Sequence, residues 1–368
     1  MYLNSRERVH AAFSHMQTDR VPINYMAESG IDRRLKAFYG VSSERELLDV
    51  LGADFYFISA RDISQNETFM PIYRGPKLDY TETERTCPLG IRFLRKVRDS
   101  KFGADEALTG PLRNAKSEQD ILSHSWPKAS WFDVDALREE CTQFSDKVII
   151  GGFWSAILGD SYRMHGFENF LLNLSMNPRL IRTLVRRVTD FYLELNERAF
   201  SALKGKLDIF FFGNDFGSQN GLLFSRQMWE DVFYQPYREL ATLAHSYGLK
   251  VMSHSCGGIS EILDLLIDAG IEILDPVQTT AAGMDTEGLK ARFGGKIVFH
   301  GAIDTQHVLP RGSVEDVRRH VEETIRVLGR HGGYVMTSCN SMQNDTPVQN
   351  IDTMYETART AADKEQRN

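Results

Sequence analysis

Short apolar runs alternate with longer segments of helical periodicity along most of this chain. From residue 147 onward the alternation is regular. Runs such as residues 148–152 and 207–212 are almost entirely apolar, and the segments between such runs repeat apolar residues at spacings of three and four. Strands that are apolar throughout are typical of a parallel sheet that helices cover on both faces.

The pattern predicts eight strands, most of them followed by a helix. The predicted strands are residues 21–25, 54–58, 148–152, 207–212, 249–253, 271–274, 296–299 and 333–337. Eight strand–helix units predict one α/β domain over residues 1–368, a single (β/α)8 TIM barrel preceded by an N-terminal helix near residues 5–15. The alternative is an open doubly wound sheet. No Gly-x-Gly-x-x-Gly motif follows the first strand, which argues against dinucleotide binding.

Residues 61–147 interrupt this rhythm after the second strand. The segment contains five prolines and two stretches of alternating polarity, residues 77–83 and 90–97. We interpret it as an insertion that contains a β-hairpin over one face, followed by a capped helix near residues 117–122.

Composition narrows the choice of partners and compartment. The chain has 368 residues, 42% hydrophobic and 25% charged, with a formal net charge of −7. An acidic chain is a poor partner for nucleic acid or for an anionic membrane. No run of about 18 apolar residues predicts a membrane span, and the N-terminus is polar rather than a secretory signal. Four cysteines are too few for a disulfide scaffold, so we expect a cytoplasmic protein with reduced thiols.

Chemically capable side chains follow the predicted strands, where the catalytic mouth of a (β/α) barrel forms. In chain order they are Glu28, Arg61, Asp62, Trp154, Asn214, Asp215, His254, Cys256, Gln278, His300, Asp304, Cys339 and Asn340. Loops are polar in any protein, and that explanation suffices for Arg61, Asp62 and Gln278. It accounts poorly for Cys256 and Cys339, because free cysteine usually packs as a small hydrophobic residue.

His254 and Cys256 end the fifth strand, and Cys339 ends the eighth. A spacing of two residues on an extended backbone points both side chains to one face. We therefore expect His254, Cys256 and Cys339 to hold one zinc ion and to leave its fourth position open, as in catalytic zinc sites. The plain alternative is a buried histidine beside two inert thiols.

Two aspartates allow two interpretations each. Asp215 follows a very apolar strand and Asp304 ends the segment His300-Gly-Ala-Ile-Asp304. Each either caps the next segment or faces a substrate. The pair Gly257-Gly258 either permits a tight turn or exposes backbone amides to an anion.

Several motifs resemble those of the uroporphyrinogen decarboxylase superfamily. They are Phe212-Gly-Asn-Asp-Phe-Gly-Ser-Gln219, His254-Ser-Cys-Gly-Gly258, His300-Gly-Ala-Ile-Asp-Thr-Gln306, Leu309-Pro-Arg-Gly312 and Asp345-Thr-Pro-Val-Gln-Asn-Ile351. The resemblance covers nearly the whole chain and implies a single-domain TIM barrel.

The decarboxylases of that superfamily hold substrate carboxylates with an arginine-rich N-terminal segment. The corresponding stretch here, Tyr25-Met-Ala-Glu28-Ser-Gly-Ile31, lacks arginine and contains an acid. A porphyrinogen would meet Glu28 where it needs a cation. The other branch contains zinc-dependent methyltransferases that act with a corrinoid protein, and their ligands are a His-x-Cys pair and a later Cys. His254, Cys256 and Cys339 match that pattern.

The resemblance therefore implies a methyltransferase that moves a methyl group between a small methylated substrate or thiol and a corrinoid (cobalamin). The chain has no Asp-x-His-x-x-Gly signature, so a partner protein is expected to supply the corrinoid. Asp215, Asn214 and Asp304 are the expected catalytic residues, which orient the reactants, and Glu28, Gln278, His300 and Asn340 are expected to contact substrate. The alternatives are a metal-free decarboxylase-like carboxy-lyase and a non-catalytic zinc module.

Overall fold

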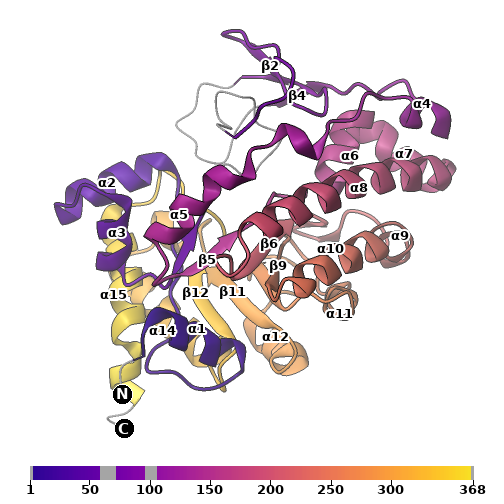
Figure 1. Cartoon of the computed structure of the whole chain (residues 1–368). Coiled ribbons are helices and arrows are strands. Elements are labelled where there is room, and N and C mark those ends of the chain that lie inside the picture. The colour runs from indigo at the N-terminus through magenta and orange to yellow at the C-terminus, as the bar shows by residue number, and fades with distance from the viewer. Residues whose placement is uncertain (1–2, 59–71, 96–105, 366–368) are drawn as a thin grey trace.

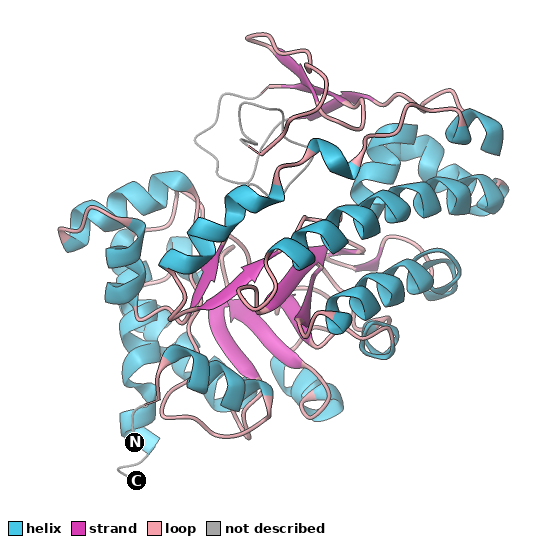
Figure 2. Cartoon of the chain, in the orientation of Figure 1, coloured by secondary structure: helices cyan, strands magenta, loops and turns pink. Residues whose placement is uncertain are grey.

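Seven parallel strands form one curled sheet at the centre of the protein (Figures 1 and 2). The computed structural model describes residues 3–58, 72–95 and 106–365. The strands are β1 (Phe55–Phe57), β5 (Val148–Gly151), β6 (Ile209–Gly213), β9 (Lys250–His254), β10 (Ile273–Val277), β11 (Val298–Ile303) and β12 (Tyr334–Ser338). Their order in space equals their order in the chain. Repeated strand–helix units produce this arrangement, so the fold is TIM-barrel-like, as the sequence predicted.

Helices surround the outer face of this sheet (Figure 2). The helices of the described residues are α1 (Ser5–Phe13), α2 (Ser29–Tyr39), α3 (Glu44–Leu51), α4 (Glu118–Leu122), α5 (Leu137–Gln143), α6 (Ile157–His165), α7 (Phe167–Met176), α8 (Pro178–Ala202), α9 (Arg226–Trp229), α10 (Gln235–Ser246), α11 (Leu263–Asp268), α12 (Thr286–Phe293), α13 (Val308–Arg311), α14 (Val314–Leu328) and α15 (Val348–Glu365). A π-helical turn, Glu230–Tyr234, joins α9 to α10. None of the helices in the described ranges has both the length and the apolarity of a membrane span.

The first predicted strand, residues 21–25, is reduced to a single bridge between Ile23 and Met336 of β12. On one side, Asn24 donates its backbone N–H to the carbonyl of Met336 at 2.9 Å. On the other, the N–H of Asp54, just before β1, donates to the carbonyl of Ile23 at 2.8 Å. The segment therefore lies between β12 and β1. Pro22 has no N–H to donate, which limits regular pairing here.

Both faces of the strands are buried, which explains why the strands are apolar at nearly every position. Side chains that point inward form a cluster to which all seven strands contribute: Phe55, Val148, Ile150, Ile209, Phe211, Met252, Ile273, Val298 and Val335. Val9 of α1 belongs to the same cluster and Phe13 packs against it. Helix α1 thus contributes to the interior of the curled sheet. Alternate residues such as Phe210, Phe212 and Val251 belong to the larger cluster shared with the outer helices.

A buried ionic network fixes the N-terminal segment at the end of the sheet where the strands begin. Asp54 is fully buried, and its carboxylate pairs with Arg8 at 2.7 Å and with Arg20 at 2.8 Å. It also accepts the backbone N–H of Ile23 at 2.9 Å. Two arginines and one amide thus satisfy a carboxylate that would otherwise be costly to bury.

The insertion contains a three-stranded antiparallel sheet. Its strands are β2 (Glu84–Thr86), β3 (Arg92–Leu94) and β4 (Glu106–Thr109). Of the two stretches predicted to form a hairpin, residues 90–97 include β3, whereas residues 77–83 precede β2. Helix α4 follows, and Ser117 caps it as predicted. Residues 59–71, which include Arg61 and Asp62, and residues 96–105 lie outside the described residues. The small sheet projects away from the central sheet, on the side of α6 (Figure 1).

Candidate metal centre

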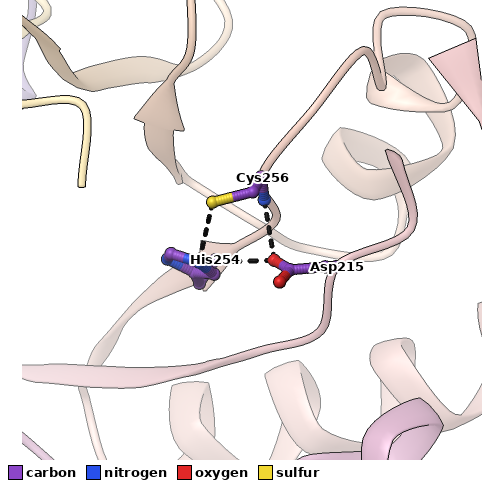
Figure 3. A group of neighbouring side chains, drawn as sticks. All are labelled: Asp215, His254 and Cys256. Carbon is purple, nitrogen blue, oxygen red and sulfur yellow. Dashed lines mark hydrogen bonds and ion pairs between the residues drawn. The ribbon is translucent and has the colours of Figure 1, made fainter. Parts of the chain in front are cut away.

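Three side chains that can bind a metal converge where β6 and β9 end (Figure 3). Nε2 of His254 lies 3.5 Å from Sγ of Cys256 and 3.4 Å from Oδ1 of Asp215. The three donor atoms all lie within 4.8 Å of one another. His254 ends β9, Cys256 follows it in the loop, and Asp215 follows β6.

The two strands bring these residues together because they are direct neighbours. Gly213 of β6 pairs with His254, and the N–H of Asn214 donates to the carbonyl of His254 at 2.9 Å. A Cβ atom at Gly213 would lie 2.2 Å from that carbonyl oxygen, so a larger residue would push the strands apart. Asp215 then accepts the backbone N–H of Cys256 at 2.9 Å.

The second nitrogen of His254 is held by a residue that our sequence analysis missed. Nδ1 of His254 lies 2.6 Å from Oδ2 of Asp275, which pairs with His254 in the register of β9 and β10. Asp275 is 1% exposed. Histidine ligands of metals commonly donate their other N–H to a carboxylate in this way. The available signal was an acidic residue inside an apolar strand, before Pro276.

His300, which we expected to contact substrate, instead binds the other oxygen of Asp275. Its Nδ1 lies 2.6 Å from Oδ1 of Asp275, and its Nε2 lies 2.9 Å from Nδ2 of Asn24. His300 is 1% exposed. Both ring nitrogens therefore have partners within the protein, and His300 lies in the interior, where Asp275 separates it from His254.

The electrostatics of the cluster favour a positive charge at its centre. Burial by itself would lower the pKa of His254. The negative charge of Cys256 and hydrogen bonds to Asp215 and Asp275 outweigh burial and raise that pKa well above its ordinary value. Burial would raise the pKa of Asp215, but the hydrogen bond and charge of His254 lower it to about 2. Asp215 is therefore ionised at neutral pH.

The donor set and its spacing fit zinc. With Zn–N and Zn–S bonds of about 2.05 and 2.3 Å, tetrahedral ligands lie about 3.5 Å apart for a nitrogen–sulfur pair and about 3.4 Å for a nitrogen–oxygen pair. The corresponding separations at His254 are 3.5 Å to Cys256 and 3.4 Å to Asp215. Magnesium and calcium prefer sets of oxygen ligands only, so sulfur and imidazole together favour a softer metal.

Cys339, the third predicted ligand, lies outside this group of donors among the described residues. Its Sγ lies 3.4 Å from Oγ1 of Thr305. Burial raises the pKa of the Cys339 thiol, and the charges of Asp304 and Cys256 contribute to that rise. The sulfur of Cys339 instead contacts Thr305, which follows β11, while the next residue in the chain, Asn340, reaches Cys256.

Asn340, a predicted substrate contact, reaches the cluster directly. Its side-chain Nδ2 donates to Sγ of Cys256 at 3.4 Å. Its Oδ1 accepts the backbone N–H of Ser341 at 2.7 Å, which fixes the orientation of the amide. Asn340 is exposed, so this donor lies on the open side of the site.

The predicted catalytic residues Asn214 and Asp304 mainly organise the backbone. Oδ1 of Asn214 accepts the N–H groups of Leu158 and Gly159, in the first turn of α6. Its Nδ2 donates to Tyr237 at 3.0 Å. Oδ1 of Asp304 accepts the N–H groups of the two residues before α13, Gln306 at 2.6 Å and His307 at 3.1 Å. Of the two interpretations left open for Asp304, the capping one describes these contacts.

Glu28 and Gln278 occupy different positions relative to the cluster. Gln278 accepts the N–H of Gly257 at 2.9 Å and donates to Gln219 at 2.7 Å, so it supports the loop that carries Cys256. Gly257 has a φ of +86°, and a Cβ there would lie 2.4 Å from the backbone of Gly217, so the tight turn requires glycine. Glu28 is buried at the start of α2, and its backbone N–H donates to Met342.

Two aromatic side chains flank the imidazole of His254. The ring of Trp154, after β5, lies 5.5 Å from the imidazole, and the ring of Phe211 lies 6.2 Å from it. Both contacts are edge-to-face. The two aromatic rings also contact each other, at 5.0 Å, while Cys256 and Asp215 lie near the Nε2 atom of His254.

The chain matches one protein family and shares its fold with a solved methyltransferase structure. The sequence model of the family described as uroporphyrinogen decarboxylase matches residues 128–361. The comparison with curated proteins gives no match. A methyltransferase from Methanosarcina mazei aligns over 99% of both chains with 14% identity and a TM-score of 0.62. A D-psicose 3-epimerase from Clostridium cellulolyticum H10 aligns over 68% of this chain and 86% of its own, with 13% identity and a TM-score of 0.37.

Proposed function

The chain belongs to the uroporphyrinogen decarboxylase family, and within it we propose a zinc-dependent methyltransferase that exchanges a methyl group with a corrinoid protein. The other reactant is a small methylated compound or a thiol. The observation that carries this proposal is the cluster of imidazole nitrogen, thiol sulfur and carboxylate oxygen at the ends of β6 and β9. The fold shared with the methyltransferase from Methanosarcina mazei supports it.

His254 and Cys256 are the proposed core of the metal site, with Asp215 beside them and Cys339 as a further candidate ligand. When bound, zinc would supply Lewis-acid chemistry, which favours the thiolate form of a thiol or polarises the heteroatom that loses a methyl group. A cysteine thiolate and a carboxylate would offset the ion's charge. No side-chain nucleophile is needed for either direction of transfer.

The chain's own residues would hold the ligands in place before any reactant arrives. Asp215 accepts the N–H of Cys256, and Gln278 accepts the N–H of Gly257. The N–H of Ser255 donates to the carbonyl of Asp275 at 2.7 Å. Three successive amides of this loop are thus fixed, which limits the positions that the Cys256 sulfur can adopt.

Asn340 and Trp154 are the proposed contacts on the reactant side. The Asn340 amide donates to the sulfur of Cys256, so it would help to hold that sulfur in place on the open side of the site. Trp154 packs edge-on against the His254 ring. Asp215, whose side chain is 60% exposed, would orient a reactant that carries a proton or a positive charge.

A corrinoid is too large for a site of this kind to enclose alone, so we propose that a separate protein brings it to the open end of the sheet. The sequence contains no Asp-x-His-x-x-Gly signature for binding a corrinoid itself. We also propose that residues 22–24 complete an eight-stranded barrel. That segment bonds to β12 on one side and, on the other, to the N–H of Asp54 immediately before β1.

The direct test loads the purified protein with zinc and adds cob(I)alamin with a panel of methylated compounds. We expect the cobalt spectrum to change to that of methylcobalamin with at least one compound. Cys256→Ser should abolish the change while the unfolding temperature of the metal-free protein stays the same. Full activity after removal of zinc by a chelator would overturn the proposal.

A metal-free carboxy-lyase is the second candidate, favoured by the description of the matched family. Asp215, which is ionised at neutral pH, would then be the acid nearest to the substrate. Metal analysis separates the two candidates. A carboxy-lyase should contain no stoichiometric zinc and should release CO2 from a substrate at the same rate with and without a chelator.

A further inference from the structure

We propose that Asp275 is the positioning residue that sets the tautomer and the ring orientation of His254, and that His300 and Asn24 hold Asp275 for this task. The inference rests on the proposed zinc site. It concerns the neighbouring strands β9, β10 and β11 and the segment 22–24. Of these, only β9 carries a proposed metal ligand, His254. The sequence pattern alone assigned no role to Asp275 or to Asn24.

A continuous line of side-chain contacts leads from the metal centre into the interior. Nδ1 of His254 meets Oδ2 of Asp275 at 2.6 Å, and Oδ1 of Asp275 meets Nδ1 of His300 at 2.6 Å. Nε2 of His300 then meets Nδ2 of Asn24 at 2.9 Å. Asp275, His300 and Asn24 are each 1% exposed, so protein groups rather than bulk water determine these contacts.

The donor and acceptor of each hydrogen bond can be assigned by starting from Asn24, the last residue of this series. Oδ1 of Asn24 accepts the backbone N–H of Tyr25 at 2.8 Å, so the oxygen and nitrogen of that amide cannot exchange places without losing a bond. Nδ2 of Asn24 therefore donates to Nε2 of His300. The proton of neutral His300 must then lie on Nδ1, where it is donated to Asp275.

Asp275 thus offers one oxygen to each histidine and accepts from both. Because Oδ1 of Asp275 accepts the hydrogen bond from Nδ1 of His300, Oδ2 is left to accept a hydrogen bond from Nδ1 of His254. A neutral His254 then carries its proton on Nδ1 and directs the lone pair of Nε2 toward Cys256 and Asp215, as metal binding requires. A carboxylate can satisfy both histidines in this way, but an amide cannot.

Asp275→Asn tests this directly because the variant keeps the shape and removes one acceptor. The amide oxygen can still accept from His300, so the NH2 group must face His254 and donate to its Nδ1. That forces the proton of His254 onto Nε2, where it blocks the metal. We expect zinc affinity, measured by competition with a chromophoric chelator, to fall about 10- to 100-fold.

Asp208→Asn is the matched control. Asp208 is also a carboxylate beside a strand of the central sheet, but it pairs with Arg6 before β6, at the other end of the strands. The zinc affinity of the Asp208→Asn variant should stay within about twofold of that of the wild type. If the wild type binds no zinc, that result contradicts both the proposed function and this inference. If the wild type binds zinc and Asp275→Asn binds within twofold of it, only the inference is overturned.

Substitutions at His300 decide the question if Asp275→Asn does not fold. His300→Gln keeps a donor for Asp275, whereas His300→Leu removes it at similar size. We expect His300→Leu to weaken zinc binding severalfold more than His300→Gln, and the absorption of the cobalt-substituted proteins to differ in the same order. Equal affinities for the two variants would contradict a positioning role, because a purely structural role would change only their unfolding free energies.

Discussion

The side-chain amide of Asn340 donates to the sulfur of Cys256 at 3.4 Å, although the two residues follow strands that are not neighbours. Asn340 follows β12 and Cys256 follows β9, with β10 and β11 between them. The curvature of the sheet brings the two strand ends together. A residue from the last strand therefore contacts the proposed metal ligand on its open side.

Asn340→Leu should weaken metal binding without disturbing the fold. The variant removes a donor to the Cys256 sulfur, and a hydrogen bond to a charged group typically contributes about 1.5–3 kcal/mol. At 3.4 Å to sulfur we expect the lower end of that range, or about a tenfold loss of zinc affinity. Isothermal titration at fixed pH measures it. An unchanged affinity would show that this amide does not help to hold the Cys256 sulfur in place.

Asp215→Asn and Cys339→Ser together identify the remaining ligand. Asp215 lies within the donor cluster and Cys339 lies outside it, so the described geometry predicts that Asp215→Asn weakens zinc binding more. The thiolate–cobalt charge-transfer band of the cobalt-substituted protein gives an independent answer. If Cys339 binds the metal, the band should fall to roughly half in Cys339→Ser, whereas a band that stays constant assigns the sulfur to Cys256 alone.

The buried network around Asp54 should dominate the stability of the N-terminal segment. Asp54→Ala leaves Arg8 and Arg20 without their shared partner, and breaking a buried ion pair costs about 3–5 kcal/mol. Denaturant unfolding measures the loss. Arg45→Ala is the control, because Arg45 and Asp146 form a pair with side chains 39% and 54% exposed, and such pairs contribute about 1 kcal/mol or less.

Lys290 should make stability depend on pH in the alkaline range. Its Nζ donates to the carbonyls of Leu328 and Gly332, both at 2.7 Å. Burial, followed by the charge of Arg330, lowers the pKa of Lys290 to about 8. The unfolded chain keeps this proton up to a pKa of about 10.4.

Between those two pKa values the unfolded state binds more protons than the folded state, so the contribution of Lys290 to stability rises with pH. We expect the wild type to gain stability relative to Lys290→Met as the pH rises from about 8 to about 10.4. Chemical unfolding of both proteins across that range measures the difference. A difference that does not change with pH would contradict the lowered pKa.

The residue pattern was sufficient to predict the strand–helix alternation and the start of the metal centre. Apolar strands are a local feature, because burial on both faces requires apolar residues at every position. The two-residue spacing of His254 and Cys256 likewise placed both side chains at the end of one strand. The prediction of a regular strand at residues 21–25 was wrong. Pro22 lacks an N–H, and the segment forms only a single bridge, from Ile23 to Met336.

Three features of the site depended on tertiary structure. Asp215 joins His254 because β6 is the direct neighbour of β9, a relationship that no local pattern contains. Asp275 binds two histidines because β10 lies between β9 and β11. His300, which we assigned to substrate, is buried with both ring nitrogens satisfied. The sequence determined which side chains stand at the ends of strands, because periodicity is local. Which of them touch was decided by strand order and by sheet curvature, because these set the distances between residues that are far apart in the chain.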